Sequence, residues 1–291
     1  MTSSTRSPQK PRRSESADPN EYVLGTGHDE AVRLGFQHRL WSASAHQLWE
    51  RCGIRPGMTV LDVGCGPGYA TTDLAQLVGP TGRVIAVDES AAFLKQLNDE
   101  AKSRKLINVE RILGDVQELD KVLPGKGGNV DIAYARWVLC FLPRPEDLVR
   151  QLGRLVRPGG VVAVQDYFDY QSMSLAPRRD VFSKVISAVG TSWRAQGGDP
   201  DIVGRLPAML RRHGFEVTSL ECNQRVARPN STMWHWPDSF WAVFVPRLAQ
   251  LGFITHADQQ AFGMAWAEAS ADPDCFMLLP PVFDLVAVKK G

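Results

Sequence analysis

The chain has 291 residues, 44% of them hydrophobic and 22% charged, which is enough for one large globular domain or one domain with an inserted subdomain. A formal net charge of +1 excludes a strongly basic field for nucleic acid, and no apolar run approaches the ~20 residues of a membrane-spanning helix. The five cysteines contain no C-x-x-C pair, which favours reduced thiols in a cytoplasmic protein over a disulfide framework.

The N-terminal part of the chain divides into two stretches of different composition. Residues 1–20 are rich in serine, proline and charge and contain almost no apolar side chains, which predicts a disordered tail. Apolar residues then recur at helical spacing over residues 32–49, and Asp29 and Glu30 are placed to stabilise the positive end of a helix. This first helix is expected to end near Cys52.

Three glycines at alternate positions follow the next apolar run. Residues 60–63 lead into Gly64, Gly66 and Gly68, and a helical pattern comes directly after them. A strand that ends in a glycine turn and opens a helix begins a nucleotide-type α/β unit, because a missing Cβ lets the backbone approach a ligand. A dinucleotide fingerprint requires glycine where this chain has Tyr69, and no Walker motif follows. The alternative is an ordinary glycine-rich turn in another doubly wound protein.

Two further strands are expected to end in an acid. Residues 83–88 are apolar up to Asp88, which lies about 20 residues after Gly68, where a ribose-binding carboxylate is found in such a unit. Residues 108–115 alternate apolar and polar and end in Asp115, placed to accept from the exocyclic amine of an adenine. The alternative for Asp115 is a cap for the residues that follow it.

The sheet pattern continues to residue 166. Residues 130–136 and 161–166 are a fourth and a fifth apolar run, separated by a helical stretch that Pro145 opens. Five strands alternating with helices predict a parallel sheet that is covered on both faces.

The pattern changes after residue 166. Helical stretches are expected over residues 178–195, 201–213 and 255–271, and strands over 215–222 and 282–288. The long segment between those two strands is unusually rich in aromatic residues around Trp234, Trp236 and Trp241.

Residues 21–166 resemble the motif series of the class I S-adenosylmethionine (SAM)-dependent methyltransferases. The resemblance is carried by residues 61–68, 86–88, 114–115 and 155–160, and it is closest to the small-molecule branch of ubiquinone and menaquinone biosynthesis. It implies SAM as cofactor and a doubly wound, Rossmann-like sheet of seven strands in the order 3-2-1-4-5-7-6, with helical cap insertions.

The resemblance also implies a domain organisation and a set of cofactor contacts. One methyltransferase domain would cover residues 21–291, with cap elements at about 21–52, 167–200 and 223–281. In relatives the segment before the first helix closes over the cofactor, which brings Tyr22 into the site. The cofactor-binding residues expected on this basis are Tyr22, Gln37, Gly64, Cys65, Gly66, Gly68, Asp88, Glu89, Asp115, Val116 and Arg136.

Methyl transfer from a sulfonium is an in-line displacement in which alignment supplies much of the acceleration, so a general base is optional. The candidate bases are His28, Asp166, Tyr167 and His235, and a histidine is more often a surface or packing residue than a base.

No metal is expected at the site. The fourth strand ends in Arg136-Trp137 and not in an acid, so the Mg²⁺ site of catechol-type enzymes is incomplete even if Asp166 and Asp169 contribute to one. No C-x-x-C or H-x-x-x-H spacing suggests zinc.

Tyr167, Trp234 and Trp236 are expected to line an apolar pocket for the methyl acceptor, with ordinary packing of the rings as the alternative. The chain is therefore predicted to methylate a small, lipophilic or ring-containing metabolite, with no nucleic-acid partner and no membrane span. Two alternatives remain open. One is an RNA or protein methyltransferase, which requires a basic face, and the other is a SAM-fold protein that binds a nucleoside ligand as a regulator or scaffold.

Overall fold

The computed structural model describes residues 28–125 and 127–291, so the tail expected at residues 1–20 and the contact expected from Tyr22 lie outside the described residues. Its centre is a seven-stranded sheet in the order β3-β2-β1-β4-β5-β10-β7, which confirms the predicted order once its strands are numbered along the chain. These strands are β1 (Thr59–Val63), β2 (Arg83–Asp88), β3 (Val109–Leu113), β4 (Val130–Arg136), β5 (Val156–Tyr167), β7 (Phe215–Asn223) and β10 (Val282–Lys289).

Strands β1 to β5 pair in parallel, whereas β10 runs antiparallel to both of its neighbours, β5 and β7. Successive residues of a strand point to opposite faces, so β1 contributes to two cores. Val60 belongs to a buried cluster with Trp49 and Leu74, and Leu61 to another that contains Leu148. This two-sided burial explains why the central strands read as continuous apolar runs.

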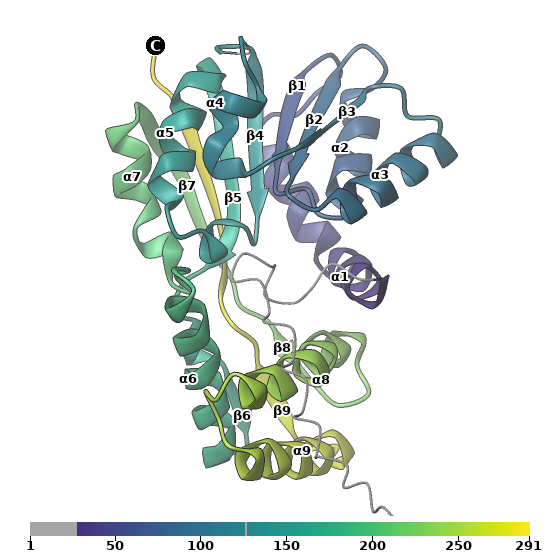
Figure 1. The fold of residues 1–291 in the computed structure, drawn as a ribbon, viewed down its shortest axis with the longest axis vertical. Coiled ribbons are helices and arrows are strands. Elements are labelled where there is room, and N and C mark those ends of the chain that lie inside the picture. The colour runs from purple at the N-terminus through teal and green to yellow at the C-terminus, as the bar shows by residue number, and fades with distance from the viewer. Residues whose placement is uncertain (1–27, 126) are drawn as a thin grey trace, which may run out of the picture.

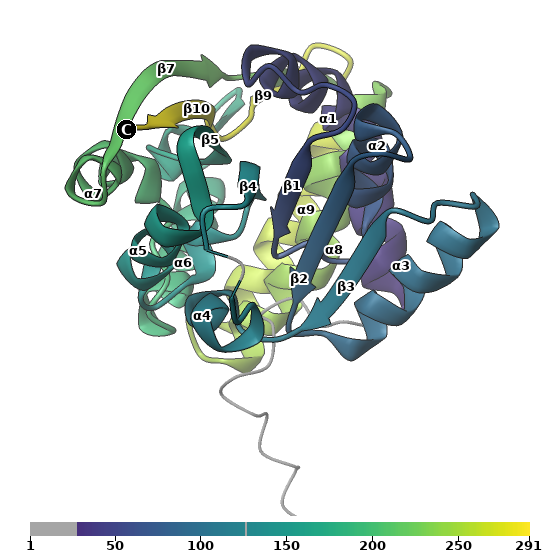
Figure 2. The same ribbon diagram turned by 90° about the horizontal axis from the view of Figure 1, so that it is seen from above.

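Helices cover both faces of the sheet (Figure 2). One face carries α1 (His28–Arg51), α2 (Tyr69–Val78) and α3 (Ala91–Ser103), and the other carries α4 (Leu119–Val122), α5 (Pro145–Leu155) and α7 (Leu206–Arg212). Local signals fix several helix starts: the Ser90 hydroxyl accepts from Phe93 N at the start of α3 (3.2 Å). Among the described residues, none of the helices has the length and apolarity that crossing a bilayer demands.

A smaller unit, called the cap below, lies beyond the carboxyl ends of the parallel strands (Figure 1). It consists of α6 (Asp180–Ala195), α8 (His235–Gln250), α9 (His256–Ala271) and a sheet ordered β6-β9-β8, with β6 (Ser174–Ala176), β8 (Val226–Ala227) and β9 (Phe276–Leu278). Helix α9 begins with a capping box between Thr255 and Asp258. The small sheet was not expected, because strands of two or three residues are too short to show an alternating pattern.

Short 3-10 helices connect these elements. Where one helix was expected over residues 201–213, the chain forms a 3-10 turn followed by α7, which has a proline in its first turn. The 3-10 helices of the described residues are η1 (Val116–Glu118), η2 (Leu139–Phe141), η3 (Tyr170–Ser172), η4 (Ile202–Gly204) and η5 (Thr232–Trp234).

Candidate functional site

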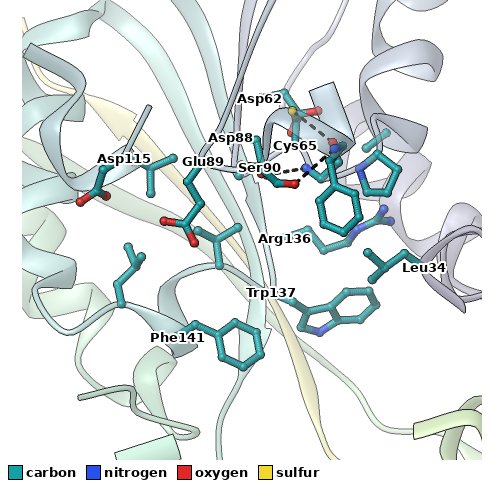
Figure 3. A pocket seen from close by; sticks show the side chains of 18 of the residues that line it. Leu34, Asp62, Cys65, Asp88, Glu89, Ser90, Asp115, Arg136, Trp137 and Phe141 are labelled. Atoms are coloured by element: carbon teal, nitrogen blue, oxygen red, sulfur yellow. Dashed lines mark hydrogen bonds between the residues drawn. The ribbon is translucent and has the colours of Figure 1, made fainter. Parts of the chain in front are cut away.

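A cavity of about 550 Å³ opens at the carboxyl ends of β1 to β4, where an open α/β sheet binds its ligands (Figure 3). Four strand-end segments and α1 form its walls. The residues expected at the site that line this first cavity are Gln37, Gly64, Cys65, Gly66, Asp88, Glu89, Asp115, Val116 and Arg136. Sequence analysis missed Leu34, Asp62, Tyr69, Phe93, Trp137 and Phe141, which also line it.

The three glycines of the turn all have positive φ, but they serve different purposes. A Cβ at Gly66 (φ +55°) would meet nothing within 4 Å, so this residue faces open space. A Cβ at Gly64 would lie 2.6 Å from a methyl of Val138, and one at Gly68 would lie 2.3 Å from Leu97. Gly68, which was expected to contact the cofactor, is not among the residues that line the cavity, and its missing Cβ leaves room for Leu97 of α3.

Asp88 holds the glycine turn as well as lining the cavity. One carboxylate oxygen accepts from Gly66 N and the other from Ser90 N, both at 2.8 Å. Burial raises the pKa of Asp88 against these two backbone hydrogen bonds, which lower it. Glu89 is directed into the cavity beside it (Figure 3), and burial, followed by the charges of Asp88 and Asp115, raises its pKa.

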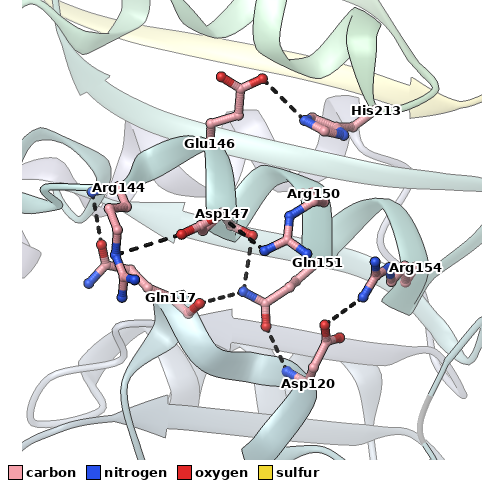
Figure 4. Close-up of polar contacts among 9 residues, drawn as sticks. All are labelled: Gln117, Asp120, Arg144, Glu146, Asp147, Arg150, Gln151, Arg154 and His213. Carbon is pink, nitrogen blue, oxygen red and sulfur yellow. Dashed lines mark hydrogen bonds and ion pairs between the residues drawn. The ribbon is translucent and has the colours of Figure 1, made fainter.

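Asp115 does what the alternative interpretation predicted: it caps η1, accepting from Gln117 N at 2.7 Å, and it also lines the cavity. The segment after it is fixed to α5 by buried Gln151, whose Oε1 accepts from Asp120 N (2.7 Å) and whose Nε2 donates to the backbone oxygen of Gln117 (Figure 4). Arg144 N in turn donates to Gln117 Oε1 at 2.9 Å. This wall of the cavity is therefore preorganised.

Asp62 is a buried acid at the floor of the cavity. Its Oδ2 accepts from the Thr71 hydroxyl at 2.6 Å, and burial raises its pKa to about 6. Asp62 could have been identified from the sequence, because it lies two residues before the first glycine of the motif at residues 61–68. Arg136 lines the same cavity, and its Nη2 donates to His38 Nδ1 of α1 at 2.9 Å.

A second, narrower cavity of about 60 Å³ adjoins the first and is called the aromatic cavity. Gln37, Trp137 and Phe141 line both cavities. The remaining residues of the aromatic cavity are Arg33, Tyr167, Tyr170, Met173, Trp193, Trp236, Pro237, Phe240, Trp241, Met277, Leu279 and Pro280.

Trp137 stands between the two cavities. It follows β4 in the left-handed conformation (φ +52°), which is rare for a bulky residue and concentrates at functional sites. Its ring stacks on Tyr167 with 6.2 Å between centroids and lies 6.0 Å from Trp236. Trp236 Nε1 donates to Gln37 Oε1 at 2.8 Å, so the cap is joined to α1 at this place.

The three residues expected to line the acceptor pocket do not all lie at one cavity. Tyr167 and Trp236 line the aromatic cavity, whereas Trp234 lines neither cavity. Its ring is stacked on Trp266 (4.4 Å between centroids) and its Nε1 donates to Ser270 at 3.1 Å. These contacts place Trp234 in the packing of the cap, which is the alternative that the sequence left open.

Of the candidate bases, Tyr167 lines the aromatic cavity, whereas Asp166 and His235 line neither cavity. Asp166 is fully buried, lines neither cavity, and accepts from Tyr167 N (2.9 Å) and Cys140 N (3.2 Å), while burial raises its pKa to about 6. Burial raises the pKa of Tyr167 well above its usual range, so its phenol stays protonated. His235 lies against Phe36 outside both cavities, and His28 is the first residue of α1.

The part of the chain that the structure describes contains no group of three or more His, Cys, Asp or Glu that could hold a metal ion. Asp169 precedes η3 in a left-handed conformation (φ +56°).

Comparison with known proteins gives a consistent picture. A family model described as a methyltransferase domain matches residues 54–194. The chain is 28% identical over 204 residues, 68% of this chain and 77% of the relative, to the ubiquinone/menaquinone biosynthesis C-methyltransferase UbiE of Ectopseudomonas mendocina. Alignments with the same enzyme from Pseudomonas strains span less, 62% to 64% of those enzymes.

Solved structures share the fold over most of the chain. A putative methyltransferase from Bacillus halodurans superimposes with a TM-score of 0.55 at 18% identity, covering 84% of this chain and 98% of that one. Geranyl diphosphate C-methyltransferase from Streptomyces coelicolor, in complex with Mg²⁺, geranyl-S-thiolodiphosphate and S-adenosylhomocysteine, gives a TM-score of 0.54 at 17% identity, covering 87% of this chain and 77% of that one.

Proposed function

Because the chain belongs to the class I SAM-dependent methyltransferases, we propose that it methylates a small, apolar, ring-containing acceptor bound in the aromatic cavity, without a metal ion. The observation that carries the proposal is the wall shared by the two cavities. Gln37, Trp137 and Phe141 line both, so an acceptor in the aromatic cavity reaches the edge of the first cavity.

The first cavity fits SAM in size and in the chemistry of its lining. Its volume of about 550 Å³ lies within the ~300–1,000 Å³ of small-molecule sites. Gly66 leaves open space where any other residue would place a Cβ. Asp88 and Glu89 are the residues that would hold the ribose hydroxyls, and Asp115 with Val116 would hold the adenine. When bound, SAM supplies a methyl group that is already activated on a sulfonium.

The mostly aromatic and aliphatic lining of the aromatic cavity supports an apolar occupant and would exclude water from the transfer. Arg33 alone carries a charge among the described residues that line it, and this arginine is paired with buried Glu30 at 2.7 Å. Gln37, Tyr170 and Trp236 come from the three segments expected to form cap elements, at about 21–52, 167–200 and 223–281. We infer that the described parts of these segments cap the acceptor site.

The acceptor must bring a nucleophile that is already reactive. Asp166 lines neither cavity, and Tyr167 keeps its proton, so neither is placed to act as a general base. The residues of the site would act by aligning the acceptor, which is worth up to ~7–11 kcal/mol for a well-oriented pair. An electron-rich ring carbon or a readily ionised hydroxyl meets this requirement.

The test is a transfer assay with methyl-labelled SAM and a panel of phenols, hydroquinones and extract fractions. We expect the label to appear in an apolar small molecule while S-adenosylhomocysteine accumulates. Label in RNA or in protein would contradict the proposed acceptor class. Binding of SAM with no S-adenosylhomocysteine formed in any fraction would indicate a regulator or scaffold instead.

A chelator is predicted to leave turnover unchanged. Strand β4 ends in Arg136 and not in an acid, and both carboxylate oxygens of Asp166 accept from backbone N–H groups, so this region offers no obvious metal ligands. The assay is repeated after treatment with EDTA and again with added Mg²⁺. Loss of turnover that Mg²⁺ restores would contradict the metal-free reaction and direct attention to Asp166 and Asp169.

A further inference from the structure

Arg136 has a hydrogen-bonding capacity that the described residues do not fill. Its Nη2 donates to His38 Nδ1 at 2.9 Å, but its Nη1 is buried and has no hydrogen-bond partner in the described structure. No ion pair joins it to a carboxylate of the described residues, and its guanidinium carbon lies 5.3 Å from the ring centroid of Trp137. Because a partly buried guanidinium without a counter-ion is unfavourable, an anion in the first cavity would stabilise it.

The side chain of Arg136 is held in place from two helices. Arginine can only donate, so His38 Nδ1 must accept from it, which leaves the imidazole proton on Nε2. That Nε2 lies 3.0 Å from Asp73 Oδ2, so a chain of hydrogen bonds runs from Arg136 through α1 to α2. Burial lowers the pKa of His38, in keeping with a neutral ring, and Tyr69 stacks on that ring at 6.0 Å.

The charges at this end of the cavity match an α-amino acid group. Such a group carries one carboxylate and one ammonium. Among the described residues that line the cavity, Arg136 is the one cation, and Asp62 is the buried one of four acids, the others being Asp88, Glu89 and Asp115. The two side chains are close enough that the charge of Arg136 lowers the pKa of Asp62 against the larger effect of burial. The backbone N–H of Gly66 is a weak partner for the carboxylate, because it already donates to Asp88.

We propose that Arg136 binds the carboxylate of the amino-acid part of SAM, and that His38 and Asp73 are positioning residues that hold the guanidinium for it. The proposal rests on the proposed function, since it requires SAM in the first cavity. A guanidinium is suited to this role because its planar set of donors matches a carboxylate.

The test compares two ligands by calorimetry: S-adenosylhomocysteine, which has the carboxylate, and 5′-methylthioadenosine, which lacks the whole amino-acid part. We expect Arg136→Met to weaken S-adenosylhomocysteine about 10- to 100-fold, the usual effect of losing a charge-assisted hydrogen bond, and to leave 5′-methylthioadenosine unchanged. Arg136→Lys, which keeps the positive charge, should lose less affinity for S-adenosylhomocysteine than Arg136→Met. Binding of 5′-methylthioadenosine also shows that each variant is folded.

The role of His38 is tested in the same assay. His38→Leu removes both the hydrogen-bond acceptor and the donor, and it should weaken binding of S-adenosylhomocysteine but not of 5′-methylthioadenosine. His38→Gln keeps one acceptor and one donor and should lose less affinity. In the Arg136→Met background, His38→Leu should cause no additional loss, because it acts through the arginine. Additive losses in the double variant would overturn the positioning role.

The two proposals fail in different ways. Wild-type protein that binds neither ligand would overturn the proposed function and this proposal with it. Wild-type protein that binds both, together with an Arg136→Met variant that melts like the wild type but binds both ligands more weakly by the same factor, would overturn the carboxylate assignment and leave the proposed function intact.

Discussion

Gly66→Val is expected to abolish binding of SAM and S-adenosylhomocysteine without unfolding the protein. A Cβ at Gly66 would meet nothing within 4 Å, and Gly66 lines the cavity, so the added side chain is expected to occupy ligand space and not the protein interior. The positive φ of +55° adds backbone strain of roughly 1–2 kcal/mol, which a domain of this size can tolerate. Calorimetric titration with both ligands, alongside thermal unfolding, measures the two effects separately.

Gly53 offers a matched control for the strain. It has a φ of +68°, a Cβ there would also meet nothing within 4 Å, and it follows α1 outside both cavities. Gly53→Val should therefore lower the melting temperature by a similar amount while SAM binding stays at the wild-type level. If Gly66→Val bound SAM as tightly as Gly53→Val, the glycine turn would not be the cofactor site.

Trp236→Ala is expected to reduce turnover of the acceptor on the order of 100-fold while SAM affinity changes little. The ring lines the aromatic cavity beside Trp137 and Tyr167, and its Nε1 anchors Gln37. Its removal would leave the acceptor free to move, and a misplacement of about 1 Å can cost a factor of 10² in rate. The kinetics are measured with the acceptor identified in the transfer assay, and SAM affinity is measured by calorimetry.

Trp234→Ala is the control that separates the loss of the pocket from the loss of stability. Trp234 is 4% exposed and Trp236 is 6% exposed, so each substitution should destabilise the protein by a similar ~3–5 kcal/mol. Trp234 packs on Trp266 and touches neither cavity, so its variant should keep acceptor turnover wherever it remains folded. Trp236→Phe keeps a ring and provides a milder variant. Equal losses of turnover at both positions would refute the acceptor-pocket assignment.

The local chemistry of the chain determined the fold and the place of the site. Apolar runs that alternate with helical stretches require a parallel sheet covered on both faces. The resemblance to the methyltransferase motif series implied the order of the strands in that sheet, including the antiparallel β10. Because parallel strands end at one edge, the glycine turn, Asp88 and Asp115 had to meet there. Each of these signals is contained in a few consecutive residues, which is why each could be interpreted without coordinates.

The tertiary structure decided which of these residues faces the cavity. Gly66 and Gly68 both have positive φ, but only their neighbours reveal that one opens onto the cavity and the other makes room for Leu97. Trp234 and Trp236 are two positions apart, yet the turn from η5 into α8 sends their rings to different partners, Trp266 and Gln37.

Contacts between distant parts of the chain were also decided only by packing. His38 and Arg136 are 98 positions apart, and nothing in either neighbourhood predicts their hydrogen bond. The three short strands of the cap sheet come from separate segments of the chain, and no pattern within one segment predicts their pairing. The direction of a side chain and its distant partners depend on how the elements pack, and patterns within one stretch of sequence carry no record of that packing.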